Sequence, residues 1–343
     1  RIPSAFRRTD RKGALMDEQK TKNDKAAAKR RLLWYRENIM HGVFFVCALV
    51  SIAAVVLICL FLFANGIPAI AEIGVFDFLL GEKWAPTNEP ASYGILPMIL
   101  GSIYITGGAI LIGVPIGILA AIFLAKYCPK RLYKVVKPAV ELLAGIPSIV
   151  YGFFGLLVIV PMIRNTFKVS GASILAATIV LGIMILPTII GLAESAIRAV
   201  PESYYEGALA LGATHERSIF RVVLPAAKSG VMAAVVLGIG RAIGEAMAVC
   251  MVAGNQTWMP QGILKGVRTL TTNIVLEMGY AADLHREALI ATGVVLFVFI
   301  LIINLLFSVL KKKSMSNSVE KKPGMFRRLF AKAKSSRKED SKA

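Results

Sequence analysis

Long runs without any charged side chain dominate the chain. Asp, Glu, Lys and Arg are absent from residues 38–71, 90–125, 142–163, 169–193, 246–264 and 288–310. A helix needs ~20 apolar residues to cross ~30 Å of bilayer hydrocarbon, and most of these runs are long enough. The pattern predicts an all-α, polytopic membrane protein with about six transmembrane helices. We place the spans at roughly 39–64, 95–125, 142–163, 172–196, 229–254 and 288–310.

Basic residues are distributed unevenly between the predicted spans. Of the 40 Lys and Arg residues, 33 lie in four alternate segments, namely 1–38, 126–137, 198–228 and 311–343. Loops on the cytoplasmic side of a membrane carry an excess of Lys and Arg. The asymmetry therefore predicts that both termini are cytoplasmic and that the number of spans is even.

The net charge of +19 belongs largely to the two ends of the chain. Residues 1–38 and 311–343 hold twelve Lys or Arg each, so we expect basic tails that set topology or contact anionic lipid, and no nucleic-acid partner. Met16 opens the stretch MDEQKTKNDK, and we expect residues 1–15 to be an upstream extension without a role in the fold. Four cysteines without a CxxC pair, and three histidines without HExxH, give no sign of a disulfide framework, a metal site or an enzyme.

Glycines recur at a spacing of four in two of the predicted spans. Gly113 and Gly117 form one such pair, and Gly240 and Gly244 form another. Small residues at this spacing let two helices approach closely. The sequence predicts tight helix packing at both places.

The segment RAVPESYYEGALALGATHERSIFRVVLPAAK (198–228) predicts a helical hairpin between the fourth and fifth spans. Pro201 suits the start of a first helix, and Gly212 suits its end. Thr214 can cap a second helix, which we expect to end before Pro225. Composition leaves two readings open: a surface for a partner protein, or a hairpin packed on its own bundle.

A longer pattern in this hairpin favours the partner surface. ABC importer permeases share a signature of Glu-Ala-Ala, three residues, Gly, nine residues, and Ile-x-Leu-Pro. This chain matches that spacing with Glu206, Gly207, Ala208, Gly212, Leu224 and Pro225. The resemblance implies a type I ABC importer permease fold, with residues 206–225 as the element that couples to a separate ATPase. Since the chain has no Walker A loop, ATP and Mg would act on that partner subunit and no cofactor on this chain.

Two charged residues interrupt the fifth predicted span. Arg241 and Glu245 are four residues apart, so on a continuous helix they would share a face and could pair. Each would cost ~2.5–3.5 kcal/mol at the centre of the membrane, so we expect them to face the bundle interior or a hydrated path. They form either a structural ion pair or a path for an anion that Arg241 attracts.

The surrounding run GIGRAIGEAMAVCMVAGN (238–255) resembles the C-type permease of the bacterial phosphate-specific transport system. The usual form of that run has Thr where this chain has Ala246, which leaves both charged residues in place. In that family the intramembrane Arg and Glu matter for transport. The resemblance therefore implies that Arg241 and Glu245 belong to the substrate path.

Two further segments support this resemblance, which covers roughly residues 70–312. LLAGIPSIVYGFFGL (142–156) is similar to the opening of that family's third span, and RTLTTNIVLEMGYA (268–281) to its last outer loop. The resemblance implies a bacterial inner-membrane permease for inorganic phosphate. Its partners would be a homologous permease in a heterodimer, two ATPase subunits and an extracytoplasmic phosphate-binding protein.

We expect four parts in the chain: a disordered basic tail (1–38), a first transmembrane helix with an outer elbow loop (39–94), a permease core with its coupling loop at 201–225 (95–312), and a second disordered basic tail (313–343). Two other functions stay open. The chain could be a permease for another oxyanion, or an ion-coupled secondary transporter, which would not need the 206–225 signature.

Overall fold

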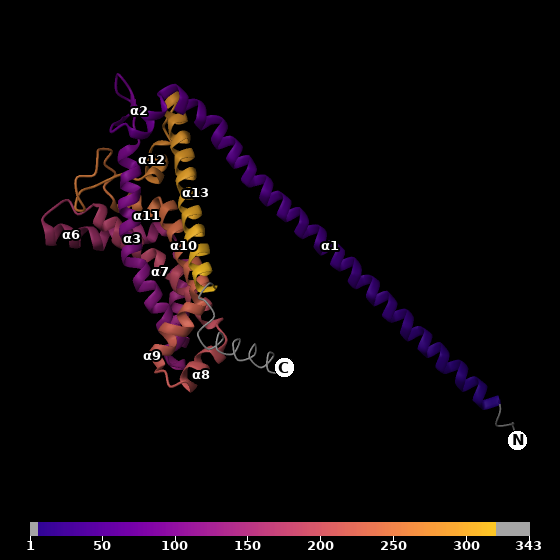
Figure 1. The fold of residues 1–343 in the computed structure, drawn as a ribbon. Coiled ribbons are helices and arrows are strands. Elements are labelled where there is room, and N and C mark those ends of the chain that lie inside the picture. The colour runs from indigo at the N-terminus through magenta and orange to yellow at the C-terminus, as the bar shows by residue number, and fades with distance from the viewer. Residues whose placement is uncertain (1–5, 320–343) are drawn as a thin grey trace, which may run out of the picture. The chain divides into compact units, whose positions relative to one another are not determined.

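The computed structural model describes the backbone of residues 6–319 and the side chains of residues 37–306, 308 and 309. Its helices are α1 (Phe6–Ile73), α2 (Val75–Leu80), α3 (Leu96–Ile122), α4 (Lys130–Gly145), α5 (Ser148–Phe154), α6 (Val160–Phe167), α7 (Ile174–Arg198), α8 (Glu202–Ala210), α9 (His215–Ser218), α10 (Leu224–Gly244), α11 (Met247–Val252), α12 (Leu270–Glu277) and α13 (Asp283–Val319) (Figure 1). Three π-helical turns join some of them, η1 (Phe123–Tyr127), η2 (Gly155–Ile159) and η3 (Ile219–Val223). Strands β1 (Trp84–Ala85) and β2 (Ser92–Tyr93) pair antiparallel, with Trp84 opposite Tyr93.

The predicted number of six spans is confirmed, although the fifth ends at Gly244 and not at the predicted residue 254. Six helices of the described chain are long and apolar enough to cross a membrane, over Glu37–Ile73, Leu96–Tyr127, Ser148–Phe167, Ile174–Arg198, His215–Gly244 and Asp283–Leu306. The chain divides into two compact units, residues 1–62 and 63–343, and α1 runs through the boundary between them. Residues 320–343 of the predicted C-terminal tail and residues 1–5 of the N-terminal tail lie outside the described residues, so the division into four parts stays a prediction.

The third span begins later than the predicted 142–163. Ile146 and Pro147 adopt extended backbone conformations, which end α4 at Gly145 and let a new helix begin at Ser148. The residue before a proline is disfavoured in the helical region, which explains the break. Residues 142–145 therefore belong to α4 and not to the span.

The second helix of the hairpin runs on into the fifth span. We expected it to end before Pro225, and this expectation is wrong, because α9, η3 and α10 follow one another without a break from His215 to Gly244. Proline lacks an amide hydrogen and its ring crowds the carbonyl four residues earlier. A wider π turn directly before Leu224 relieves that conflict. The same arrangement occurs where η2 precedes Pro161.

Helix α7 lies at the centre of the bundle and packs against α3 and α10. A Cβ on Gly113 would lie 2.8 Å from the side chain of Ile185, and one on Gly117 would lie 2.8 Å from that of Ile189. The predicted close packing of the second span is therefore confirmed. At Gly240 and Gly244 no helix of the described chain approaches in this way, because a Cβ there would meet none of its atoms within 4 Å.

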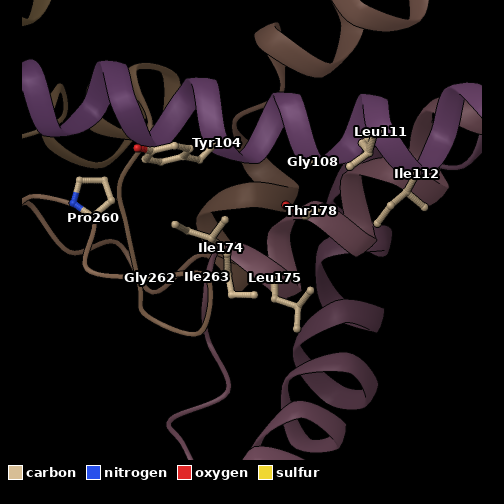
Figure 2. A pocket seen from close by; sticks show the side chains of 10 residues that line it. All are labelled: Tyr104, Gly108, Leu111, Ile112, Ile174, Leu175, Thr178, Pro260, Gly262 and Ile263. Atoms are coloured by element: carbon tan, nitrogen blue, oxygen red, sulfur yellow. The ribbon is translucent and has the colours of Figure 1, made fainter.

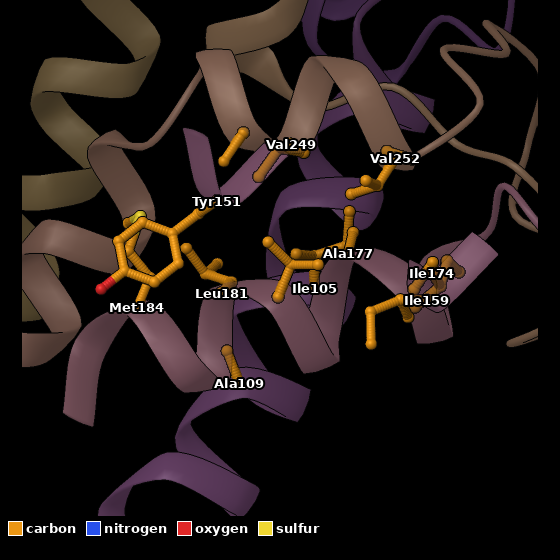
Figure 3. Packing of buried hydrophobic residues seen from close by; sticks show 14 of the residues in the cluster. Ile105, Ala109, Tyr151, Ile159, Ile174, Ala177, Leu181, Met184, Val249 and Val252 are labelled. Atoms are coloured by element: carbon orange, nitrogen blue, oxygen red, sulfur yellow. The ribbon is translucent and has the colours of Figure 1, made fainter. Parts of the chain in front are cut away.

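The main hydrophobic core surrounds the first half of α7. Figure 3 shows side chains from α3, α5, α7 and α11 interdigitating there, with Leu181 and Met184 of α7 fully buried among them. This core fixes α7 against α3 and α11. It thereby helps to fix the backbone next to the predicted site residue Glu245, which directly precedes α11 in the chain.

Candidate functional site

The predicted site residues lie in two places. The hairpin of α8 and α9 lies at one end of the bundle, far along α10 from the residues near its C-terminal end (Figure 1). Arg241 is in the last turn of α10, and Glu245 directly follows that helix.

The hairpin turn has the geometry that the sequence predicts. Gly212 has a φ of +81°, a left-handed conformation that side chains other than glycine rarely adopt. The hydroxyl of Thr214 accepts a hydrogen bond from the backbone N–H of Arg217 at 3.3 Å, so the predicted N-cap is confirmed. Leu211 is 90% exposed at the tip. The turn is locally well specified and presents an apolar side chain to whatever covers it.

The signature residues lie mainly on the outside of this hairpin. Exposed positions are Glu206, Gly207, Gly212 and Pro225, and half-buried positions are Ala208 and Leu224. A Cβ on Gly207 would meet no atom of the described residues within 4 Å, so none of them covers the surface beside it. Contact of these residues with an ATPase stays a prediction.

The hairpin is tied to the adjoining end of α3 and η1. Lys126 pairs with Glu202 at 2.9 Å and lies over the ring of Tyr205. The Tyr205 hydroxyl and His215 Nδ1 are 2.6 Å apart, and the ring of Tyr127 meets that of His215 edge-on at 4.9 Å. These contacts would therefore transmit a displacement of the hairpin to the spanning helix α3.

A second polar cluster connects α4, α7 and η1. The Glu194 carboxylate is 1% exposed and accepts hydrogen bonds from the Tyr133 hydroxyl, Lys137 Nζ and Arg198 Nε, each at 2.7 Å. Arg198 also donates to the Leu124 carbonyl at 2.7 Å. Burial would lower the pKa of Lys137, but its hydrogen bond to Glu194 raises that pKa above the usual value. Sequence reasoning missed this cluster because its members come from distant segments and form no local motif.

Arg241 points into a cleft between α7, α10 and α13. Its Nη1 donates to the Thr188 hydroxyl at 2.9 Å. The cleft has a volume of ≈ 620 Å³, and its lining residues are Thr188, Ala233, Val236, Leu237, Gly240, Arg241, Asn304 and Ser308. Among the described residues, Arg241 forms no ion pair with a carboxylate.

Arg241 and Glu245 do not form the structural ion pair that the sequence left open as one of two alternatives, as far as the described residues show. Helix α10 ends at Gly244 and Glu245 has extended backbone, so the two side chains do not share one helical face. The Glu245 carboxylate instead accepts a hydrogen bond from the N–H of Ala248 at 3.1 Å, in the first turn of α11. Its carbonyl accepts a hydrogen bond from the Thr271 hydroxyl at 3.0 Å, so α12 holds the break in place.

A third polar network, which sequence reasoning also missed, joins the β hairpin to α12 and α13. Glu277 accepts hydrogen bonds from Trp84 Nε1 at 2.8 Å and from Arg268, and its other close contact is His285 Nε2 at 2.9 Å. Arg268 also donates to the Asn255 carbonyl at 3.1 Å. Burial alone would raise the pKa of Glu277, but these hydrogen bonds bring that pKa below its usual value.

A separate pocket of ≈ 340 Å³ lies between α3, the start of α7 and the segment around Gly262 (Figure 2). Its lining is apolar apart from the hydroxyls of Tyr104 and Thr178, and none of the described residues that line it is charged. A site of this composition suits hydrocarbon. It does not suit an anion.

Comparison with known proteins identifies relatives over most of the chain. Residues 113–315 match the family described as "Binding-protein-dependent transport system inner membrane component". A probable ABC transporter permease protein, YqgH of Bacillus subtilis, is 46% identical over 272 residues, which cover 76% of this chain and 88% of the relative. The phosphate transport system permease protein PstC of Mesorhizobium japonicum is 37% identical over 263 residues, covering 71% and 80%.

Solved structures with the same fold are more distant in sequence. An inward-facing methionine ABC transporter, MetNI, matches with a TM-score of 0.53 at 20% identity, covering 64% of this chain and 95% of that one. A bacterial alginate ABC transporter, solved with an alginate-bound periplasmic protein, matches with a TM-score of 0.54 at 17% identity, covering 78% and 94%. The fold is that of a type I ABC importer permease.

Proposed function

The chain belongs to the family of binding-protein-dependent transport system inner membrane components, and we propose that it is the permease subunit of an ATP-driven phosphate importer. As an ABC permease it is a non-catalytic, multi-pass subunit, and ATP is hydrolysed on a separate ATPase. The proposal adds the substrate and the residues that meet it.

The observation that carries the proposal is Arg241, an arginine inside a predicted span that has no carboxylate partner among the described residues. A guanidinium stays charged at any physiological pH and presents several donors in a fixed fork. Phosphate has the matching charge and oxygen geometry. Relatives named as phosphate permeases, at 33–37% identity, support phosphate over other oxyanions.

In this mechanism Arg241 replaces part of the hydration that phosphate loses in the membrane. Glu245 shapes the path by holding the first turn of α11, and its charge helps the anion to leave. The chain does no covalent chemistry. Alternating access comes from movement of the bundle, which ATP and Mg on the partner subunits drive.

The coupling step uses the hairpin. Glu206, Gly207, Ala208, Gly212, Leu224 and Pro225 would form or support the surface that enters the ATPase. Because the hairpin is joined to α3 through Lys126 and continues into α10, closure of the ATPase would move both spanning helices together.

The full complex would contain a homologous permease, two ATPase subunits and an extracytoplasmic phosphate-binding protein. In this arrangement both termini face the cytoplasm. The basic tails would contact anionic lipid on that side.

The test is purification of the chain with its associated subunits, followed by ATPase measurement in proteoliposomes with the binding protein. Phosphate should stimulate ATP hydrolysis, and sulfate at the same concentration should not. Stimulation by sulfate alone would indicate another oxyanion as the substrate. Phosphate uptake driven by an ion gradient without any ATPase would indicate a secondary transporter and contradict the proposal.

A further inference from the structure

We propose that Thr188, Asn304 and Ser308 join Arg241 in lining the route by which the anion leaves toward the end of the bundle that carries α8 and α9. This inference rests on the proposed function and extends it to three residues outside any motif. It names α13 as one wall of the substrate path.

The cleft around Arg241 has a consistent direction. Ala233, Val236, Leu237, Gly240 and Arg241 recur at helical spacing and form one stripe of α10. Ala233 is eight residues nearer to the hairpin than Arg241, about 12 Å at the rise of an α-helix. The cleft therefore extends from Arg241 toward the hairpin end of the bundle.

The opposite wall carries two polar side chains in residues 293–310 of α13, a stretch that is otherwise apolar. Asn304 and Ser308 are four residues apart, so they share a face of α13, and both line the cleft. Both are exposed, and the neighbouring Leu305 and Leu306 are apolar. An exposed amide in a membrane-spanning helix is unfavourable against hydrocarbon but favourable against water or a polar solute. Their position in the cleft with Arg241 fits the second case.

The chemistry of the lining suits release of an anion. Arg241 supplies the full charge, the Thr188 hydroxyl is its direct hydrogen-bond partner, and Asn304 and Ser308 offer neutral N–H and O–H donors farther along. Neutral donors bind an anion more weakly than a guanidinium does. Among the described lining residues there is no carboxylate that would repel phosphate.

The first experiment measures ATP-driven phosphate uptake by the full complex in proteoliposomes, per assembled complex. Asn304→Leu removes the amide at nearly constant volume, and we expect uptake to fall roughly 10-fold, as for loss of one hydrogen bond to a charged group. The matched control is Asn304→Leu combined with Leu305→Asn, which moves the amide ~100° around the helix. We expect uptake by this double variant to stay low.

Recovery of uptake in the double variant, or wild-type uptake by Asn304→Leu, would overturn the inference. If Arg241→Gln still abolishes uptake in that case, the proposed function stands and only the α13 wall fails. If Arg241→Gln also transports normally, the proposed path through Arg241 fails as well.

A second measurement does not depend on how Asn304→Leu assembles. Single cysteines replace Ser308 and Leu305 in a complex whose native cysteines have been removed, and a small anionic thiol reagent is added from the hairpin side. We expect the cysteine at position 308 to be labelled, at a rate that changes when phosphate is added or ATP is hydrolysed. We expect little labelling at position 305. Equal labelling at both positions would contradict the assigned route.

Discussion

Replacement of Gly212 by alanine should loosen the hairpin without disturbing any packing. The φ of +81° places this residue in the left-handed region, where a residue with a Cβ costs ~1–2 kcal/mol. A Cβ there would meet no atom of the described residues within 4 Å, so we expect the effect to arise from the backbone. A change of this size lowers the ratio of native to non-native turn roughly 5–30-fold.

Gly207 provides a matched control five residues away in the same hairpin. It lies within α8, and a Cβ there also meets nothing within 4 Å. Alanine in a helix is favoured over glycine by ~0.8–1.0 kcal/mol, so Gly207→Ala should stabilise α8. The two substitutions add the same methyl group and should have opposite effects.

The assay is retention of the ATPase subunits by affinity-purified permease, measured over increasing salt, together with limited proteolysis at the hairpin. Gly212→Ala should lose the ATPase at lower salt and be cleaved faster, and Gly207→Ala should behave like the wild type or better. Gly212→Asn should fall between them, because asparagine tolerates the left-handed region. Equal ATPase retention and equal cleavage for the two alanine variants would refute this reasoning.

Three further predictions concern packing and charge, measured by thermal unfolding in detergent except where stated. Glu194→Gln leaves Lys and Arg partners around a neutral amide and should lower the free energy of unfolding by ~3–5 kcal/mol. The control Glu141→Gln, at an exposed carboxylate, should lower it by less than ~1 kcal/mol. Gly117→Ala should lower the free energy of unfolding by ~1–3 kcal/mol through overpacking. Gly107→Ala should not lower it, because a Cβ at this position of the same helix would meet no described atom within 4 Å. Because folding lowers the pKa of Glu277 below its ordinary 4.5, its stabilising effect is complete above that pH and is lost as pH falls through the folded-state value. Acid unfolding followed by tryptophan fluorescence should therefore depend less on pH in Glu277→Gln.

Similar unfolding temperatures for Glu194→Gln and Glu141→Gln would mean that the buried cluster adds little stability. Similar temperatures for Gly117→Ala and Gly107→Ala would mean that the contact between α3 and α7 can relax. An unchanged acid profile in Glu277→Gln would place the acid-sensitive group elsewhere.

The spans and the hairpin turn could be predicted from the sequence because their causes are local. A run of ~20 apolar residues is sufficient to indicate a membrane helix. Gly212 and Thr214 determine their turn and cap through their own backbone and side chain. The close approach of α3 to α7 at Gly117 could be predicted in kind, but not its partner, Ile189.

The charged residues could not be placed correctly because their geometry depends on other segments. Spacing alone put Arg241 and Glu245 on one face, but the helix ends at Gly244 and the Thr271 hydroxyl holds the following backbone. The bonds of Glu194 likewise come from α4 as well as from its own helix. Tertiary contacts of this kind have no periodic signature in the chain.

The most direct measurement compares ATP-driven uptake of radiolabelled phosphate by the wild-type complex and by Arg241→Gln, per assembled complex. Lys228→Gln, an exposed substitution near the start of the same helix, serves as the control. We predict that Arg241→Gln assembles with the ATPase but does not take up phosphate, and that Lys228→Gln transports normally. Uptake at the wild-type rate by assembled Arg241→Gln would contradict the assignment of Arg241 to the phosphate path.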